Sequence, residues 1–154
     1  MSADSLPKAE DCNCFAVRSA PRHVSQFYDQ FLVPIGLRTT QYSILTRLKR
    51  KGPLTINALA EDMVMDRTTL GRNILPLERD GLIQVEPVRT DRRAKELHLT
   101  SAGEKRLQAG VKAWTQAQTQ FETAFGAKRA AELRTMLRSV VGSEFTPKAQ
   151  PAGQ

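Results

Sequence analysis

Arginine, threonine and asparagine side chains gather on one side of the helical segment that follows Asp66. At roughly 100° per residue, the apolar residues Leu70, Ile74 and Leu77 fall on one face, which must pack against a core. Arginine can pair with guanine edges, asparagine with adenine, and threonine with a phosphate or a thymine methyl group. The pattern favours a helix that binds the major groove of double-stranded DNA, with an ordinary solvated helix as the alternative. The polar residues on the exposed side are Arg67, Thr68, Thr69, Arg72 and Asn73.

A second group of arginines follows between Val88 and Ala94, which enclose Arg89, Arg92 and Arg93. Arginine side chains suit the narrow minor groove, where the negative potential of DNA is high. A merely solvated loop is the alternative for this segment. The charge agrees with a polyanionic partner, because residues 38–100 carry twelve basic and eight acidic side chains in a chain of net charge +7.

Two cysteines, Cys12 and Cys14, precede the first helical segment, and Arg18 and Arg22 follow them at helical spacing. Neighbouring arginines favour a reactive thiolate, so Cys14 is a candidate redox sensor, with inert, half-buried thiols as the alternative. Two cysteines exclude a disulfide framework and agree with a reducing cytoplasm, where we expect the protein. The two histidines lie far apart in the sequence, so neither a metal site nor a cofactor is expected.

The spacing of the apolar residues predicts the helices that must position these groups. Residues 13–34 carry an apolar stripe at spacings of three and four, with Pro21 inside the segment. A second helix over 40–51 ends in three basic residues before a Gly-Pro pair. Thr55 and Asp66 are placed to cap two short helices in close succession, which is the arrangement of a helix-turn-helix.

The apolar period then changes from 3.6 to 2. Residues 83–86 and 96–99 alternate between apolar and polar types, which predicts a two-stranded hairpin with the arginines at its tip. Ser101 and Glu104 have the spacing of a capping box that opens a long helix, and a last helix covers about 128–141. The expected fold is mainly α with a small two-stranded β wing.

The run from Gln41 to Thr100 resembles the MarR family of winged helix-turn-helix regulators. The resemblance rests on TINALAEDMVMDRTTLGRNILPLERDGLI and on the pattern Asp91-x-Arg93-x-Lys95-x-x-x-Leu99-Thr100, and the order of elements agrees over residues 12–142. It implies a homodimer in which the first and last helices of the two subunits intertwine. Each subunit would present one winged lobe to a palindromic operator, usually as a repressor, and a small molecule or an oxidant would release the DNA.

The resemblance makes residues 12–142 one functional unit, with a DNA-binding lobe over 38–100 and dimerisation helices over 12–37 and 101–142. The polar composition of residues 1–11 and 143–154 predicts mobile tails on either side. Large apolar residues on the terminal helices favour the dimer independently, because a chain of this size cannot easily cover them all; a larger intramolecular core is the alternative. These residues are Phe27, Phe31, Trp114, Phe121, Phe125, Leu133 and Leu137.

Individual roles also follow from the resemblance. Asp91 would orient Arg93, which would enter the minor groove, with Arg92 and Lys95 in the same wing. The polar residues after Asp66 would lie in the major groove. The candidates for phosphate contact are Thr39, Thr40 and Thr55.

A small-molecule effector would, by the same resemblance, occupy a pocket between the first, second and fifth helices near the dimer seam. Two arginines there would suit an anionic ligand, such as an aromatic carboxylate or a thioester; salt bridges across the dimer are the alternative. The candidate lining residues are Arg18, Arg22, His23, Tyr28 and Trp114.

The other candidate signal is an oxidant. In the organic-hydroperoxide-sensing branch of the family, a reactive cysteine is followed by Phe-Ala, as Cys14 is here. Tyr28 falls in register with one tyrosine of that branch, whereas Thr39 and Arg18 stand where the branch has its other aromatic residues. Cys12 and Cys14 are therefore the residues of an alternative, thiol-based sensing function.

Other classes of function fit less well. No Ser-His-Asp order, Gly-rich phosphate loop or pair of carboxylates marks an enzyme. No apolar run approaches about 18 residues and no signal-peptide pattern opens the chain, so neither a membrane span nor secretion is expected. A protein-interaction or membrane-surface module would leave the arginine-bearing hairpin unexplained. RNA binding is disfavoured because no strand carries the aromatic residues typical of it.

Overall fold

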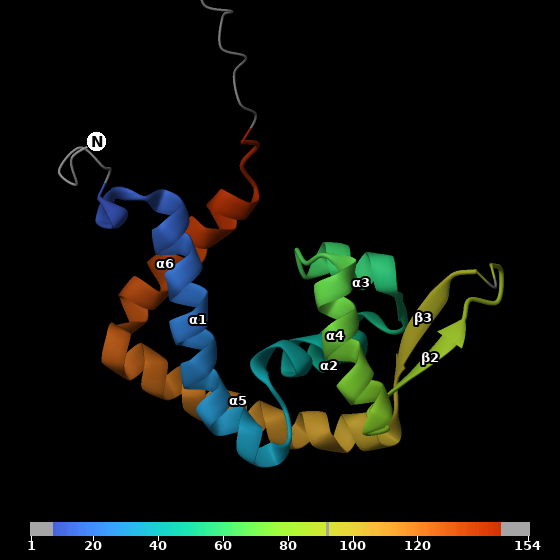
Figure 1. The fold of residues 1–154 in the computed structure, drawn as a ribbon. Helices are drawn as coiled ribbons and strands as arrows, with labels where there is room; N and C mark the ends of the chain where they lie inside the picture. Colours follow the sequence, from blue (N-terminus) through green and yellow to red (C-terminus); the bar gives the residue numbers. More distant parts are fainter. Residues whose placement is uncertain (1–7, 92, 146–154) are drawn as a thin grey trace, which may run out of the picture. The chain divides into compact units, whose positions relative to one another are not determined.

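The computed structural model describes residues 8–91 and 93–145, so Arg92 and the outer parts of both expected tails lie outside the described residues. The chain forms two compact units that divide within one helix, between Ala117 and Gln118. Figure 1 shows the order of the helices and strands along the chain. Two short 3-10 helices, Ala9–Asp11 and Val33–Ile35, flank the first α-helix. The elements of the first unit are α1 (Asn13–Leu32), α2 (Thr39–Lys51), β1 (Leu54–Thr55), α3 (Ile56–Asp62), α4 (Arg67–Arg79), β2 (Ile83–Pro87), β3 (Lys95–Leu99) and the start of α5 (Ser101–Phe125).

The fold class is confirmed, with one addition to the sheet. The hairpin of β2 and β3 is present, with Val85 opposite Leu97, but the sheet has three antiparallel strands in the order β1-β3-β2. The expectation of two strands missed β1, where Leu54 pairs with Leu97. Two residues cannot show an alternating pattern, and their partner strand lies far along the chain. The additional strand, β1, joins the hairpin to the start of α3, because it pairs with β3 and directly precedes α3.

Local signals placed most helix ends correctly. The Thr55 hydroxyl accepts a hydrogen bond from the Ala58 N–H at 3.2 Å, and the Asp66 carboxylate accepts one from the Thr69 N–H at 2.8 Å. Both are N-caps that satisfy amides in the first turn of a helix. Gly81 ends α4 with φ +69°, a conformation that glycine adopts without the steric cost of a side chain. α1 continues through Pro21 and α4 through Pro76.

The predicted capping box at the start of α5 is wrong. The cap is Thr100, whose hydroxyl accepts from the Gly103 N–H at 3.0 Å and donates to the Gly81 carbonyl at 2.7 Å. Glu104 instead pairs with Lys49 of α2 at 2.5 Å. Thr100 therefore joins three places: the turn after α4, the end of β3 and the start of α5.

The core of the first unit lies between α2, α3, α4, the sheet and the first turns of α5. Buried leucines from these five segments and from α1 meet there, and among the described residues every buried residue is an apolar residue, a tyrosine or a glycine. Gly110 of α5 lies against the Tyr42 ring, where an added Cβ would come within 2.9 Å of Cδ2. The largest fully buried side chains are Leu32, Leu37, Ile44, Leu45, Leu59, Leu70, Leu77, Ile83 and Leu97.

The outer face of α5 is open in the single chain. Leu107, Gly110 and Ala117 face the interior, whereas Val111 is 48% and Trp114 37% exposed. The Trp114 ring stacks on Tyr42 of α2, with ring centroids 6.3 Å apart. The first unit thus buries one side of α5 and leaves large apolar groups on another.

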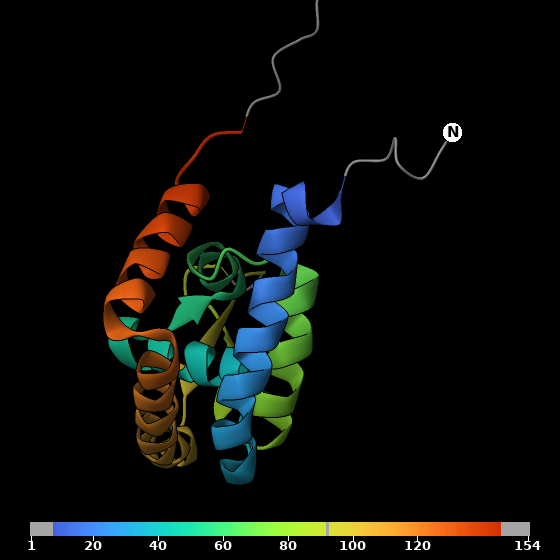
Figure 2. The ribbon, with the colours of Figure 1, turned by 90° about the vertical axis from the view of Figure 1, so that its left-hand side faces the viewer.

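The second unit contains the end of α5 and α6 (Ala127–Val141). The chain changes direction at Gly126, which has φ +96° (Figure 2). Glu122 and Arg134 form an ion pair at 3.1 Å across this turn, and the Arg129 guanidinium lies 4.4 Å from the centre of the Phe125 ring. Ala130 is buried, while Met136, Leu137, Val140 and Val141 are exposed. No helix within residues 8–91 and 93–145 is both long and apolar enough to cross a membrane.

Candidate nucleic-acid interface

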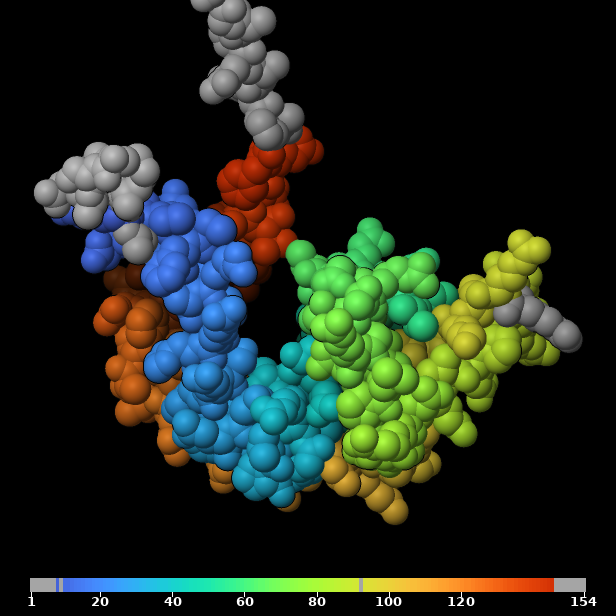
Figure 3. Space-filling view, viewed as in Figure 1, coloured from blue at the N-terminus to red at the C-terminus, as the bar shows by residue number. Residues whose placement is uncertain are grey.

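α4 has the two-sided character that its sequence predicts. Leu70, Ile74 and Leu77 are buried against the core, so the opposite side of the helix must face outward. Arg67, Thr68 and Arg72 are exposed on the outward side, and Leu75 is 65% exposed. Figure 3 shows the green surface of the α4 segment uncovered on the face toward the viewer. The outward side is therefore basic and polar over the N-terminal half of α4. One large apolar residue, Leu75, follows on the same side further along the helix.

The first turn of α4 is fixed by hydrogen bonds within the helix. Asp66 accepts from the Thr69 N–H and also from the Thr69 hydroxyl at 2.6 Å. These hydrogen bonds from Thr69 hold the pKa of the Asp66 carboxyl below its usual value. The Asn73 side chain donates to the Thr69 carbonyl at 2.9 Å. Thr69 and Asn73 are thus engaged within the helix, while Arg67, Thr68 and Arg72 extend outward.

The turn between α3 and α4 holds an unexpected residue. Val64 has φ +51° and is 72% exposed, although β-branched residues rarely adopt a left-handed conformation. The turn is closed by hydrogen bonds from the Val64 N–H to the Glu61 carbonyl at 3.0 Å and from the Met65 N–H to the Ala60 carbonyl at 2.9 Å. No glycine marks this left-handed position in the sequence, so sequence reasoning missed it.

A carboxylate that the sequence analysis did not single out joins α3 to α2. Asp62 pairs with Arg47 at 2.7 Å and with Lys51. The hydrogen bond from Lys51 is the largest cause that lowers the pKa of Asp62 below its usual value, with further contributions from the charges of Lys51 and Arg47. The contact fixes the end of α3, directly before the turn that leads into α4.

The tip of the hairpin is shaped by backbone hydrogen bonds. The Val88 N–H donates to the Ala94 carbonyl at 2.9 Å, and the Ala94 N–H donates to the Asp91 carbonyl at 3.0 Å. The Asp91 carboxylate accepts the Arg93 N–H at 3.0 Å, so Asp91 fixes the backbone from which Arg93 extends. Arg89, Arg93 and Lys95 are exposed on the hairpin.

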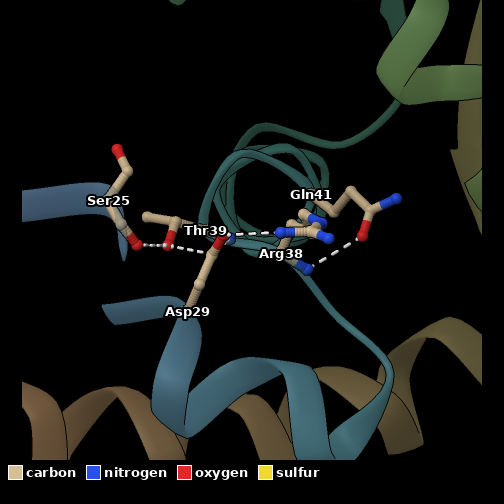
Figure 4. Close-up of polar contacts among 5 residues, drawn as sticks. All are labelled: Ser25, Asp29, Arg38, Thr39 and Gln41. Carbon is tan, nitrogen blue, oxygen red and sulfur yellow. Dashed lines mark hydrogen bonds and ion pairs between the residues drawn. The ribbon is translucent and has the colours of Figure 1, made fainter. Parts of the chain in front are cut away.

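The three threonines predicted to contact phosphate lie in different surroundings. Thr39 donates to Asp29 of α1 from both its N–H and its hydroxyl, each at 2.7 Å (Figure 4). Thr55 is half-buried as the cap of α3, and Thr40 is half-buried in the first turn of α2. Thr39 is therefore committed to a contact between helices, and the phosphate contacts remain predictions.

The effector and redox candidates fall into two places. Cys12, Cys14, Arg18 and Arg22 line one hollow of about 360 Å³ at the N-terminal end of α1, together with Phe15 and Ser19. Both thiols are exposed, and the Cys12 sulfur accepts the Phe15 N–H at 3.4 Å as the N-cap of α1. His23, Tyr28 and Trp114 do not line this hollow.

The described parts of the chain, 8–91 and 93–145, contain no group of three or more His, Cys, Asp and Glu residues that could hold a metal ion. On the sheet, the His98 ring lies beside two carboxylates. Its Nε2 atom is 2.9 Å from Glu96 and 3.8 Å from Glu86.

Comparison with known proteins explains the combination of α4 and the hairpin. Residues 37–95 match the sequence model of the MarR family. The chain is 31% identical to the Mycobacterium tuberculosis transcriptional regulator MosR, crystallised in complex with DNA, over 86% of this chain and 98% of that one, with a TM-score of 0.73. The chain belongs to the MarR family. Its fold is that family's winged helix, with α3 and α4 as the helix-turn-helix and the β2–β3 hairpin as the wing.

Two further transcriptional regulators are also similar to the chain. A probable transcriptional regulator from Pseudomonas aeruginosa is 26% identical over 86% of this chain and 99% of that one, with a TM-score of 0.75. The organic hydroperoxide resistance transcriptional regulator of Bacillus subtilis is 27% identical over 96 residues, which are 62% of this chain and 65% of that protein. The chain therefore spans less than two thirds of the length of the curated relatives it matches.

Proposed function

We propose that this MarR-family chain is a sequence-specific regulator that binds double-stranded DNA with α4 in the major groove and the wing in the minor groove. The observation that carries the proposal is the division of α4 into a buried apolar face and an outward face with Arg67, Thr68 and Arg72. The likeness to MosR, whose structure was determined with DNA, supports it.

The chemistry of each element suits a different groove. Arg72 can make two hydrogen bonds to a guanine edge, and Thr68 can contact a phosphate or a thymine methyl group. The N-terminal amides of α4 add a positive potential that attracts phosphate. Arg93, held on the turn that Asp91 stabilises, reaches outward from the wing and suits the high negative potential of the minor groove. Two elements of one compact unit thus supply both contacts.

The regulator acts as a homodimer on a palindromic operator, and it represses by covering its site. The exposed apolar residues on the helices outside the winged helix support this assembly, because a second copy would remove them from water. In that dimer, residues 38–100 form the DNA-binding lobe, and residues 12–37 and 101–142 form the dimer contacts. The exposed residues concerned are Phe15, Val17, Val111, Trp114, Met136, Leu137, Val140 and Val141.

A small anionic effector releases the DNA by binding near Arg18 and Arg22. The shared hollow at the start of α1 supports this part, since two exposed guanidinium groups border one space there. The same hollow also supports the second candidate function, oxidation sensing. An organic hydroperoxide would oxidise the Cys14 thiol to a sulfenic acid and leave as the alcohol, and the new polar group would alter the hollow.

Selection of bound duplexes from a random DNA library, using the full chain, tests the function. We expect an inverted repeat whose half-site centres lie about one helical turn, roughly 10 base pairs, or a multiple of it apart. Enrichment of no sequence would contradict the proposal. An organic hydroperoxide and a panel of aromatic acids are then added to the complex. If the peroxide releases DNA from the wild type but not from Cys14→Ser, the thiol is the sensor. If an aromatic acid releases DNA from the wild type but not from Arg18→Ala, the hollow beside Arg18 is the anion site.

A further inference from the structure

One carboxylate makes the side-chain polar contacts between the end of α1 and the start of α2, beside the buried Leu32 and Leu37. Asp29, near the end of α1, accepts the Thr39 N–H and the Thr39 hydroxyl on one oxygen, each at 2.7 Å. Its other oxygen accepts from the Arg38 guanidinium at 3.1 Å. Only 19% of the Asp29 side chain is exposed, and Figure 4 shows all three contacts converging on it.

Asp29 takes the place of a cap that α2 does not have in its own sequence. The residue before α2 is Arg38, whose guanidinium has only hydrogen-bond donors and cannot accept the amides of the first turn. Gln41 accepts the Arg38 N–H at 2.8 Å, but the Thr39 N–H is satisfied by Asp29 from another helix. The Thr39 amide in the first turn of α2 therefore has this partner only when α1 lies in this position.

The two helices that Asp29 joins have different surroundings. α2 carries Tyr42, Ile44, Leu45 and Leu48 into the core of the winged helix, so it moves with α4. α1 is mostly exposed over its N-terminal half, where the hollow with Arg18 and Arg22 lies. The chain between the helices forms a 3-10 turn and a left-handed Gly36 at φ +76°. Asp29 thus lies where α1, whose last turn is buried in the core at Leu32, meets the proposed DNA-binding lobe of residues 38–100.

We infer that Asp29 is a positioning residue that fixes the direction of α1 relative to the winged helix and thereby sets the separation of the two α4 helices in the dimer. The inference rests on the proposed dimeric DNA-binding function. In that dimer α1 belongs to the contact between subunits, so a change in its angle to α2 alters the distance between lobes. A rigid junction restricts the protein to operators of one half-site spacing.

The test compares operators that differ only in spacing. The selected palindrome is prepared with its centre unchanged, shortened by one base pair and lengthened by one base pair, and a duplex with a single half-site is added. Each extra base pair shifts a half-site by about 3.4 Å and rotates it by roughly 35°. The affinities of the full-length wild type, Asp29→Ala, Asp29→Asn and Glu104→Gln are measured by fluorescence anisotropy. Glu104→Gln is the matched control, because it breaks the ion pair of α2 with α5 and leaves the α1–α2 junction intact.

We expect the wild type and Glu104→Gln to lose about tenfold or more in affinity when the spacing changes by one base pair, and Asp29→Ala to lose less than about threefold. Asp29→Ala should bind the single half-site as the wild type does, because α4 and the wing are intact. Asp29→Asn should be intermediate, since its amide oxygen still accepts the Thr39 N–H but the pairing with Arg38 is lost.

Two results would overturn the inference. One is an Asp29→Ala variant that discriminates spacing as sharply as the wild type. The other is equal loss of affinity on all duplexes, including the single half-site, which would mean that Asp29 supports only the stability of the lobe. A wild type with no sequence preference on any duplex would instead contradict the proposed function, so the two failures are distinguishable.

Discussion

α4 and the wing both present arginines, but the molecule supports them in different ways. α4 is fixed by Leu70, Ile74 and Leu77, which the core covers completely or nearly so. The tip of the wing is held by backbone hydrogen bonds around Val88 and Ala94, and its side chains at Arg89, Asp91 and Arg93 are exposed. A change in the buried face of α4 should therefore affect both folding and DNA binding, whereas a change at the tip of the wing should affect DNA binding alone.

Removing the buried anchor of α4 should give the largest effect. Leu70→Ala leaves a cavity in the core and should lower the free energy of unfolding by about 2–5 kcal/mol. Arg93→Ala, at the tip of the wing, should change it by less than about 0.5 kcal/mol. Urea unfolding followed by circular dichroism measures both. Equal destabilisation by the two variants would contradict the contrast between α4 and the wing.

The place where α4 and the wing meet should be nearly as sensitive. A Cβ at Gly103 would overlap the Leu82 carbonyl and approach the Leu99 side chain to 2.7 Å, so Gly103→Ala should destabilise the protein by about 1–3 kcal/mol. Gly71 in α4 is the matched control, because a Cβ there meets nothing within 4 Å. Gly71→Ala should stabilise the protein by about 0.5–1 kcal/mol. The same urea titration checks the pair, and a neutral Gly103→Ala would show that the junction adapts.

Substitutions in α4 and in the wing should change DNA binding in different ways. Arg72→Ala should weaken binding to the selected operator by about 1–3 kcal/mol and relax the preference at one base-pair position. Arg93→Ala should cost a similar amount without relaxing any major-groove position, because its contact lies in the minor groove. Anisotropy titrations against operators with single base-pair changes measure this, with Lys8→Ala, an exposed cation before α1, as the control. If Arg93→Ala relaxed a major-groove position, the assignment of the wing would be wrong.

The smallest effect should come from the turn before α4. Val64 bears the cost of a left-handed conformation, about 1–2 kcal/mol, which glycine avoids at an entropic cost of about 0.5–1 kcal/mol. Val64→Gly should therefore raise the free energy of unfolding by up to about 1 kcal/mol. Val33, which has φ −59°, provides the comparison, and Val33→Gly should lower it. A loss of stability in Val64→Gly would show that the valine side chain contributes contacts that outweigh its strain.

Elements specified by local signals could be predicted from the sequence. Thr55 and Asp66 each precede an apolar helical period and cap it, and Gly81 ends α4 in the left-handed conformation. The alternation in residues 83–86 and 96–99 placed the hairpin, because each strand has one face on the core. The exposed side of α4 followed from the same periodicity.

Contacts between distant segments could not be predicted in this way. The hydroxyl of Thr100 is chosen as a cap over Ser101 because it also binds the Gly81 carbonyl, which only the fold brings near. Asp29 is an ordinary polar residue in the sequence, and its role appears only once Thr39 lies beside it. The left-handed conformation of Val64 could not be predicted from its residue type, because glycine is the usual residue at such a position.

The most direct test of the central claim is a binding titration of the full-length protein against its selected operator and a scrambled duplex of the same length and composition, at about 0.15 M salt. If α4 and the wing bind base edges, the operator should be bound at least about 10³-fold more tightly than the scrambled duplex. The logarithm of the affinity should also fall with the logarithm of salt concentration, with a slope of about −0.9 per neutralised phosphate. Equal affinities for the two duplexes would contradict the account.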